Sequence, residues 1–595
     1  MNVLQNIIFK DLKSSYTDKL FFGWENNSAY FDYKEHNIRI FKHRYIASNT
    51  FYNAFDLSFW KRNCGIKTLF LTLRGRGKAI ARIGLGTRQF NKIWLEEAEL
   101  DFDCEKGGEK RIEVSDVDSL EDGVLSFDLI ALSEEFVFEG GFYGTDDAQQ
   151  NDVKMGIVVT HFNHQKEVAS FYARLNAEIL STPEFSGKIK MVIVDNSNNL
   201  DHSNFPNATI VPNNNLGGSG GFTRGLMYLQ DNGFTNCVFM DDDGDLLLES
   251  IARTEKIFEY VKDKQTAIAG VLLQEEHPNI IREMGATFNK KGFVELNYAG
   301  IDLDNALNVV RISKPNPFVN YGAWCYFGFN VSAAKILPFP FFVRGDDIYF
   351  SLQNKFNIVS EIGIACLVPS FELKESPLTR YLGVRSELLI TLSKNSISAR
   401  KTVLKNLWHR FFGQLYSYNY ASCLAITRAI SDINAGAKTF FSDPDAGKAR
   451  SYISSLPYSE KKTTTCFKSE DFLEKDYDRK PKFYKLTKHK FVRHLTINGL
   501  LLPKACTLRT TFILPKSNEA NKRDIYRHDT VYYYDDRNET GYFAHRQTKA
   551  GAHAIIGFVR EFMKFKHNYR KLCAEYRNVS APEDFWKKQF GFEEK

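Results

Sequence analysis

Cysteine chemistry is sparse in this 595-residue chain. Its nine cysteines are scattered, their total is odd, and no two of them form a Cys-x-x-Cys pair. Disulfide frameworks and structural zinc sites depend on closely and regularly spaced cysteines. The pattern argues against both and predicts a reducing compartment.

Long apolar runs are missing as well. No window approaches 18 uncharged apolar residues, the length that a helix needs to cross a bilayer. Residues 1–13 lack a continuous apolar stretch, so we expect no signal peptide. The usual nucleic-acid recognition motifs are also missing, so we expect no nucleic-acid partner despite the net charge of +6.

Positive charge is concentrated near the C-terminus. Residues 480–595 contain 24 Lys and Arg against 12 Asp and Glu. Such an excess favours contact with an anionic surface, either a membrane or a polyanionic acceptor, but it is equally typical of a solvated basic face.

The length predicts a multidomain protein of two to four domains. In residues 1–148, short β-branched and aromatic runs between turn residues predict a β-sandwich or jelly roll. In residues 149–395, strands alternate with helices, which predicts an α/β domain with a parallel sheet. Residues 396–595 carry apolar residues at helical spacing and predict a mainly helical, basic domain.

The most informative stretch is an apolar run that ends in acids. Residues 237–240 are apolar, and Asp241, Asp242 and Asp243 follow directly. A buried parallel strand delivers such acids to the sheet edge where ligands bind. Asp241 and Asp243 alternate along an extended chain, so both can face one divalent cation. A solvated acidic turn is the alternative.

A glycine-rich stretch, residues 213–225, lies between two expected strands of this sheet. Four glycines in five residues permit close backbone approach, and the apolar residues after them suggest that a helix begins here. Its first N–H groups would suit a phosphate, unless the stretch is a flexible loop. Two earlier strands end in the polar loops 160–163 and 195–198, which suit a nucleotide base and ribose.

A second apolar run ends in the adjacent acids Asp346 and Asp347, with a helix expected after them. Two crowded carboxylates titrate as a pair, and one of them gains a raised pKa that suits a general base. Capping of the helix is the alternative. Aromatic residues at 324–329 can stack on a sugar ring or belong to the core.

Together these motifs resemble the family-two inverting glycosyltransferases of the GT-A fold, and more closely the bacterial galactofuranosyltransferases that extend polysaccharides. The resemblance runs from about residue 50 to near the C-terminus. It rests on FYNAF and FW in the N-terminal part, NNNLGGSGGFTRG, FMDDD, the Trp324 segment and RGDDIYFS.

The resemblance implies a role for each motif. Asp241 and Asp243 would bind a divalent metal, Mn²⁺ or Mg²⁺, and Asp347 would be the catalytic base with Asp346 beside it. Trp324 and Tyr326 would contact the acceptor. The nucleotide-sugar site would comprise Thr160, Asn163, Asp195, Asn215, Gly217, Gly218, Gly220, Arg224 and Asp242.

The chain departs from the family at one metal ligand. Relatives usually place a ligating His after the base, where this sequence has Val368. Ser370 or Glu372 would have to replace it, or the Asp ligands with phosphate and water would suffice.

The expected function is transfer of galactofuranose from UDP-galactofuranose to an O-antigen, capsule or galactan, with inversion at the anomeric carbon. Another donor, UDP-galactopyranose or dTDP-rhamnose, is the alternative within the class. A non-catalytic glycan-assembly scaffold is the alternative outside it. The partners would be the donor, a glycan or lipid-linked acceptor and a further copy of the chain. We expect a cytoplasmic protein, or one bound peripherally to the inner membrane.

Overall fold

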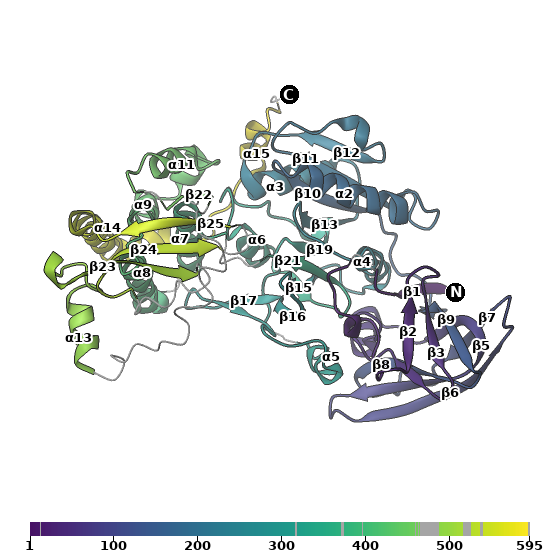
Figure 1. Cartoon of the computed structure of the whole chain (residues 1–595). Helices are drawn as coiled ribbons and strands as arrows, with labels where there is room; N and C mark the ends of the chain where they lie inside the picture. Colours follow the sequence, from purple (N-terminus) through teal and green to yellow (C-terminus); the bar gives the residue numbers. More distant parts are fainter. Residues whose placement is uncertain are drawn as a thin grey trace.

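The structure is a computed structural model. It describes residues 1–11, 14–315, 318–369, 374–394, 397–458, 460–461, 463–464, 487–515, 525–535 and 539–592. Figure 1 shows an N-terminal β domain and a C-terminal region on opposite sides of a central α/β domain. In the part of the chain described, no helix is both long and apolar enough to cross a membrane.

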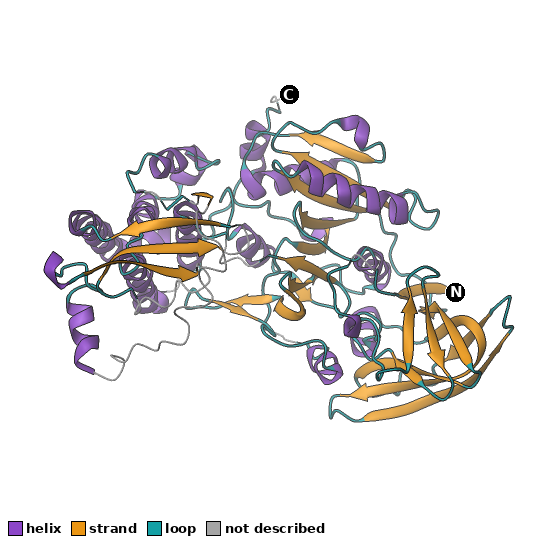
Figure 2. Cartoon of the chain, in the orientation of Figure 1, coloured by secondary structure: helices purple, strands orange, loops and turns teal. Residues whose placement is uncertain are grey.

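Nine antiparallel strands make up the N-terminal domain (Figure 2). They are β1 (Asn2–Ile7), β2 (Ala29–Asp32), β3 (Asn37–Phe41), β4 (Tyr45–Ala47), β5 (Phe70–Thr87), β6 (Lys92–Phe102), β7 (Gly108–Glu113), β8 (Gly123–Ala131) and β9 (Glu135–Thr145). The long strand β5 connects them, because its first part pairs with β7 and β9 and its second part with β6 and β8. The β-rich prediction is confirmed; the sandwich or jelly roll stays a prediction.

The aromatic segment 51–62 packs in the interior. Phe51, Tyr52, Phe55 and Trp60 are each at most 1% exposed, and the Trp60 ring lies 6.3 Å from that of Tyr260 in the central domain. The segment therefore packs between the two domains and is not available for contact with a sugar.

The central sheet has seven strands in the order β12-β11-β10-β13-β19-β14-β20. They are β10 (Met155–His161), β11 (Ile189–Asp195), β12 (Ala208–Pro212), β13 (Asn236–Asp241), β14 (Thr266–Ala269), β19 (Tyr326–Asn330) and β20 (Asn357–Val359). Strands β12, β11, β10 and β13 run parallel, as the sequence predicts, and β19 runs antiparallel between β13 and β14. The parallel strands bring His161, Asp195 and Asp241 to one edge.

Helices α2 (Gln165–Leu175), α3 (Gly217–Asp231) and α4 (Glu249–Tyr260) accompany this sheet. A smaller sheet, β16-β15-β21, and the hairpin β17–β18 extend the domain toward the C-terminal region (Figure 1). Their bounds are β15 (Val271–Gln274), β16 (His277–Met284), β17 (Ala286–Phe288), β18 (Val294–Leu296) and β21 (Ala365–Val368). Helices α5 (Ala306–Ile312) and α6 (Asp346–Asn354) complete the domain.

The C-terminal region is built on the helices α7 (Pro377–Ser393), α8 (Arg400–Leu415), α9 (Tyr420–Ala435) and α14 (Thr548–Glu575). Shorter helices are α10 (Lys438–Ser442), α11 (Gly447–Ser454), α13 (Thr487–Leu495) and α15 (Glu583–Gln589). The prediction of a mainly helical region missed a four-stranded sheet of β22 (Thr463–Thr464), β23 (Leu508–Pro515), β24 (His528–Asp535) and β25 (Thr540–His545). Helix α15 returns to the central domain, where the Trp586 indole N–H donates to the Pro338 carbonyl at 2.9 Å.

Candidate active site

Asp241 ends strand β13, and the strand register places it beside Thr160 of β10. The Cys325 thiol donates to its carboxylate at 3.2 Å. Burial, followed by repulsion from Asp243, raises the pKa of Asp241 to about 6. A buried carboxylate with one weak thiol donor is incompletely compensated, which favours a cation beside it.

Asp242 points toward the loop after β10. It accepts hydrogen bonds from the Phe162 backbone N–H and from His164 Nδ1, both at 2.9 Å, and His161 Nδ1 lies 3.5 Å away. Burial opposes ionisation, but the interactions with the two histidines and with the Phe162 N–H outweigh it and lower the pKa of Asp242. These contacts hold the loop after β10 in place, and the role of Asp242 in nucleotide-sugar binding stays a prediction.

Asp243 pairs with a cation of the chain itself. Lys374 Nζ lies 2.7 Å from its carboxylate, and neither side chain is fully buried. Among the described residues, no three His, Cys, Asp or Glu side chains gather in a geometry that would hold a metal. Val368 is buried in β21 and cannot ligate, and Ser370 and Glu372 lie outside the described residues.

The two carboxylates nevertheless fit one kind of metal site. Mg²⁺ and similar hard cations are usually held by one or two carboxylates together with substrate phosphates and water, and not by a protein cage. Asp241 and Asp243 supply such a donor set, and the incompletely compensated charge of Asp241 supports it.

The polar strand ends hold the loops together more than they face a ligand. The buried Asp195 carboxylate accepts four backbone N–H groups, from residues 197, 198, 199 and 200, at 2.8 to 3.1 Å. A carboxylate offers about four acceptor positions, so none remains for uridine. The Asn163 side chain accepts from Asn199 at 2.9 Å, and it is exposed to solvent.

Residues 217–225 of the glycine-rich stretch form the first part of helix α3 and not a flexible loop. Gly217 begins the helix at φ +67°, where an added Cβ would lie 2.1 Å from the Phe342 carbonyl oxygen. At Gly220 a Cβ would lie 2.2 Å from Leu216 Cβ. At Gly217, only glycine permits the helix to lie this close to Phe342 in the turn before α6.

N–H groups in the first turn of α3 donate to acceptors of the protein itself. The Gly217 N–H donates to the Asn215 side chain at 3.1 Å, and the Ser219 N–H donates to the Phe342 carbonyl at 3.1 Å. An added Cβ on Gly218 would lie 3.4 Å from the Asp346 carboxylate. The helix N-terminus thus faces Asp346, and its dipole stabilises the ionised form of that group.

Arg224 lies further along α3 and away from the acids. Its guanidinium is 4.4 Å from the Phe592 ring centre and 5.7 Å from that of Phe590, and burial lowers its pKa. The residue therefore holds the C-terminal segment against α3.

Asp346 and Asp347 occupy the first turn of α6, after Gly345 at φ +85°. Gly345 is the N-cap, so neither acid has the capping role. The Ser219 hydroxyl donates to Asp346 at 3.0 Å. Burial and the charge of Asp347 raise the pKa of Asp346 to about 7, and burial raises that of Asp347 to about 6.

The sequence did not single out Glu283 and Tyr321, which adjoin Asp347. Burial and then the charge of Asp347 raise the pKa of Glu283 to about 8, and burial with Glu283 and Asp347 raises that of Tyr321. No motif marks either residue; Glu283 lies on the short strand β16, and only the packing of the smaller sheet brings it to the site.

The charges of the two groups of acids affect some of the same buried residues. The charge of Asp347 raises the pKa of Glu283. Glu283 and Asp241 both contribute to the raised pKa of the buried Cys325 thiol, although burial contributes most. Contacts through α3 also connect the two groups, because Asp241 lies beside Thr160, an added Cβ on Gly221 would lie 2.3 Å from Thr160, and Ser219 of the same helix donates to Asp346.

The predicted acceptor residues are in the interior. Trp324 is 5% exposed, and its ring lies 5.0 Å from those of Phe222 and Phe239. The fully buried Tyr326 hydroxyl lies 2.7 Å from Thr254 Oγ1 and donates to the Ser250 carbonyl. The arrangement agrees with the core alternative for this segment.

The comparisons match the chain to one class of protein, the glycosyltransferases. No family model matches the chain. Its curated relatives are galactofuranosyltransferases.

Galactofuranosyltransferase GlfT2 of Mycobacterium tuberculosis is 23% identical over 332 residues, which cover 52% of this chain and 51% of the relative. The GlfT2 of Mycolicibacterium smegmatis is 23% identical over 450 residues, 68% of this chain and 67% of the relative. The match thus spans about half of the first relative and two thirds of the second.

Solved structures similar to the chain include GalNAc-T7 with UDP, GalNAc and Mn²⁺, at 10% identity and a TM-score of 0.31, over 42% of this chain and 49% of that one. Another is the mannosyltransferase PcManGT from Pyrobaculum calidifontis with GDP-Man and Mn²⁺, at 12% identity and a TM-score of 0.27, over 52% and 86%.

Proposed function

We propose that the chain is an inverting glycosyltransferase that transfers galactofuranose from UDP-galactofuranose to a growing cell-surface polysaccharide. The observation that carries the proposal is a chain of contacts through α3: Asp241 lies beside Thr160, an added Cβ on Gly221 would lie 2.3 Å from Thr160, and Ser219 donates to Asp346, the neighbour of Asp347. One group suits a nucleotide diphosphate with its counter-ion, and the other suits an alcohol that must lose a proton.

The reaction is a single displacement. The Asp347 carboxylate takes the proton of an acceptor hydroxyl while that oxygen forms a bond to the anomeric carbon. The bond from this carbon to the UDP oxygen breaks with its electron pair, so the configuration inverts. A pKa of about 6 keeps Asp347 largely ionised at neutral pH and still basic enough to accept the proton.

Asp346 has a supporting role. The Ser219 hydroxyl and the N-terminus of α3 hold its carboxylate. Its charge is kept next to that of Asp347, and this repulsion makes the pair more basic than isolated carboxylates. Most of the rate enhancement beyond proton transfer would come from positioning of the two substrates.

Asp241 and Asp243 would hold the divalent metal, Mn²⁺ or Mg²⁺. When bound, such a metal neutralises negative charge that develops on the departing diphosphate. Lys374 pairs with Asp243 at 2.7 Å, so a metal would have to displace its ammonium from that carboxylate.

We also place the protein in the cytoplasm, peripherally on the inner membrane. Helix α14 carries Lys564, Lys566 and Arg570 among the exposed apolar side chains Ile556 (71%) and Met563 (52%). This combination suits an anionic lipid surface, where a lipid-linked acceptor would lie.

The test measures UDP release by the purified chain with UDP-galactofuranose, Mn²⁺ and an oligosaccharide acceptor. Asp347→Asn should lower the rate about 10²- to 10⁴-fold, because the proton acceptor is lost. Asp245→Asn is the control, since Asp245 follows strand β13 as Asp241–Asp243 do, but it pairs with Arg174 at 2.6 Å. No release with any donor, and so no loss on Asp347→Asn, would favour the scaffold alternative. Release only from UDP-galactopyranose or dTDP-rhamnose would identify that sugar nucleotide as the donor instead.

A further inference from the structure

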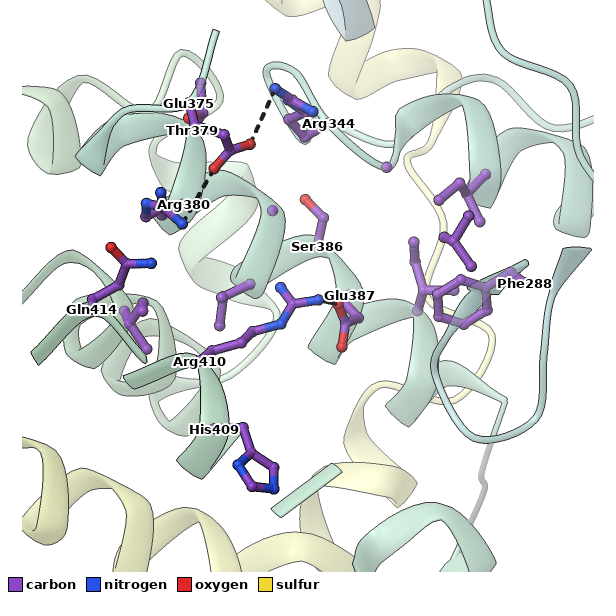
Figure 3. A pocket seen from close by; sticks show the side chains of 17 residues that line it. Phe288, Arg344, Glu375, Thr379, Arg380, Ser386, Glu387, His409, Arg410 and Gln414 are labelled. Carbon is purple, nitrogen blue, oxygen red and sulfur yellow. Dashed lines mark hydrogen bonds and ion pairs between the residues drawn. The ribbon is translucent and has the colours of Figure 1, made fainter. Parts of the chain in front are cut away.

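A cavity of about 580 Å³ lies between α6 and the C-terminal helices α7, α8 and α9 (Figure 3). None of the roles assigned above uses it. Binding sites for small molecules usually occupy about 300–1,000 Å³, so the cavity has room for a short oligosaccharide. Helix α7 forms the longest wall, and Phe288 and Val294 of the hairpin β17–β18 close one side.

The cavity adjoins the reaction centre at two points. Arg344 and Gly345 line it, and the charge of Arg344 lowers the pKa of Asp347, which burial raises. Glu375 also lines it and follows Lys374, the partner of Asp243. A ligand that fills the cavity would therefore lie next to the turn that carries Asp347.

Gly383 leaves space that the fold itself does not need. It lies in the interior of α7 and lines the cavity, and an added Cβ would meet no atom within 4 Å. A glycine inside a helix costs about 1 kcal/mol relative to alanine. No neighbour requires this glycine, so the space beside it is available to a ligand.

Ser386 presents an unsatisfied hydroxyl in the same wall. Its side chain is 1% exposed, and its Oγ has no hydrogen-bond partner among the described residues. Figure 3 shows it between Arg344 and Glu387. A buried hydroxyl without a partner is costly, and a hydroxyl group of a ligand would satisfy it.

The charged residues of the lining occur in opposite pairs. Glu375 lies 3.6 Å from both Arg344 and Arg380, and Arg410 pairs with Glu387 (Figure 3). Neighbouring donors and acceptors match hydroxyl groups, which both donate and accept. The lining has a net charge of +1 with His409 neutral, but each of its three arginines already pairs with a glutamate, which favours a neutral polyhydroxylated ligand over an anionic one.

We propose that this cavity binds the inner sugar units of the oligosaccharide acceptor, while the terminal unit presents its hydroxyl to Asp347. The inference rests on the proposed function for the identity of the reacting end. It adds that the C-terminal helices select acceptors several sugars long.

The test compares Gly383→Met, which fills the cavity, with Gly557→Met. Gly557 lies in helix α14, where an added Cβ would have one ordinary contact, with Thr427 at 3.8 Å. The probe is a galactofuranose tetrasaccharide, titrated by calorimetry without donor. We expect Gly383→Met to weaken binding at least tenfold and Gly557→Met to change it less than twofold, while both bind UDP like the wild type.

Ser386→Ala separates binding from folding. Removal of an unpaired buried hydroxyl should leave the melting temperature unchanged or raise it. The dissociation constant of the tetrasaccharide should nevertheless rise about threefold to tenfold, as expected for one lost hydrogen bond.

The proposal is overturned if Gly383→Met binds the tetrasaccharide like the control, or if the wild type does not bind it. Calorimetry requires no turnover, so this result is separate from the proposed function. If tetrasaccharide binding depends on Gly383 but the transfer assay shows no UDP release, the proposed transferase activity is contradicted. The proposal that the cavity binds an oligosaccharide is then still supported.

Discussion

Among single residues, the acids of the site differ because their surroundings differ. Asp242 accepts protein hydrogen bonds that lower its pKa, whereas burial raises the pKa of Asp241, Asp346 and Asp347. Groups whose environments move their pKa values apart are suited to different tasks. Asp242 is suited to structure, and the other three to counter-ion and proton chemistry.

The rate of transfer should depend on pH through the paired aspartates. A base acts in its ionised form, so kcat/KM should rise with pH and level off above an apparent pKa between about 6 and 7. Initial rates from pH 5 to 8.5, with UDP affinity measured over the same range, check this. If the rate did not change with pH across that range, Asp347 could not be the base.

Lys374 should compete with a metal at Asp243. Lys374→Met removes the ammonium 2.7 Å from that carboxylate, so the Mn²⁺ concentration at half-saturation should fall a few-fold. An exposed ion pair contributes about 0–1 kcal/mol, which limits the effect. Calorimetric titration of Mn²⁺ with UDP present measures it. Arg174→Met removes the similar pair with Asp245 and should change nothing; an equal shift in both variants would contradict the prediction.

The position of a functional residue was predictable where a motif specified both the residue type and the end of the element that carries it. Asp241, Asp346 and Asp347 lie at the predicted element ends. The family resemblance implies ligand roles for Asp195, Arg224 and Trp324, whereas in the structure they contact local N–H groups, the C-terminal segment and neighbouring rings. Such partners come from distant parts of the chain, and no local pattern reveals them.

Among the elements, helix α3 shows how glycines place a functional turn. At Gly221 an added Cβ would lie 2.3 Å from Thr160, and at Gly225 it would lie 2.2 Å from Val158, both in β10. The helix therefore lies directly on the strand, and Ser219 reaches Asp346. A glycine-rich run has low helix propensity, and tertiary packing outweighs it here.

Gly225→Ala should separate α3 from β10. The added methyl overlaps Val158, and overpacking of this kind costs about 1–3 kcal/mol. Urea unfolding measures the loss. The control is Gly557→Ala, also in a helix but with room for the methyl, which should be neutral or stabilising by up to about 1 kcal/mol. Similar free energies of unfolding for both variants would contradict the close approach.

The C-terminal sheet shows where element prediction failed. Residues 508–515 and 528–535 contain the β-branched and aromatic runs of strands β23 and β24. Helical periodicity in the flanking segments led to a helical reading of the whole region. The two strands are parallel neighbours, a non-local pairing that periodicity does not encode.

For the whole molecule, buried polar contacts fix the β domain to the central domain. Arg253 of α4 is 2% exposed and donates to the Tyr52 carbonyl at 2.7 Å and to that of Asn6 at 3.2 Å. Glu249 of the same helix accepts from the Asn6 backbone N–H at 2.7 Å and pairs with Arg253 at 3.1 Å. The sequence indicated the two domains, but it contained no signal for this connection, because each partner is an ordinary residue within its own segment.

Arg253→Met should therefore weaken the contact between the two domains. It leaves Glu249 and two backbone carbonyls without their buried donor, and loss of one member of a buried ion pair costs about 3–5 kcal/mol. Thermal unfolding should show a lower midpoint, and limited proteolysis should cut the chain between residues 146 and 154 faster. Arg82→Met removes a more exposed pair, with Glu97, inside the β domain, and should cost less than about 1 kcal/mol. If both variants unfold and are cleaved alike, the Arg253 network does not hold the domains together.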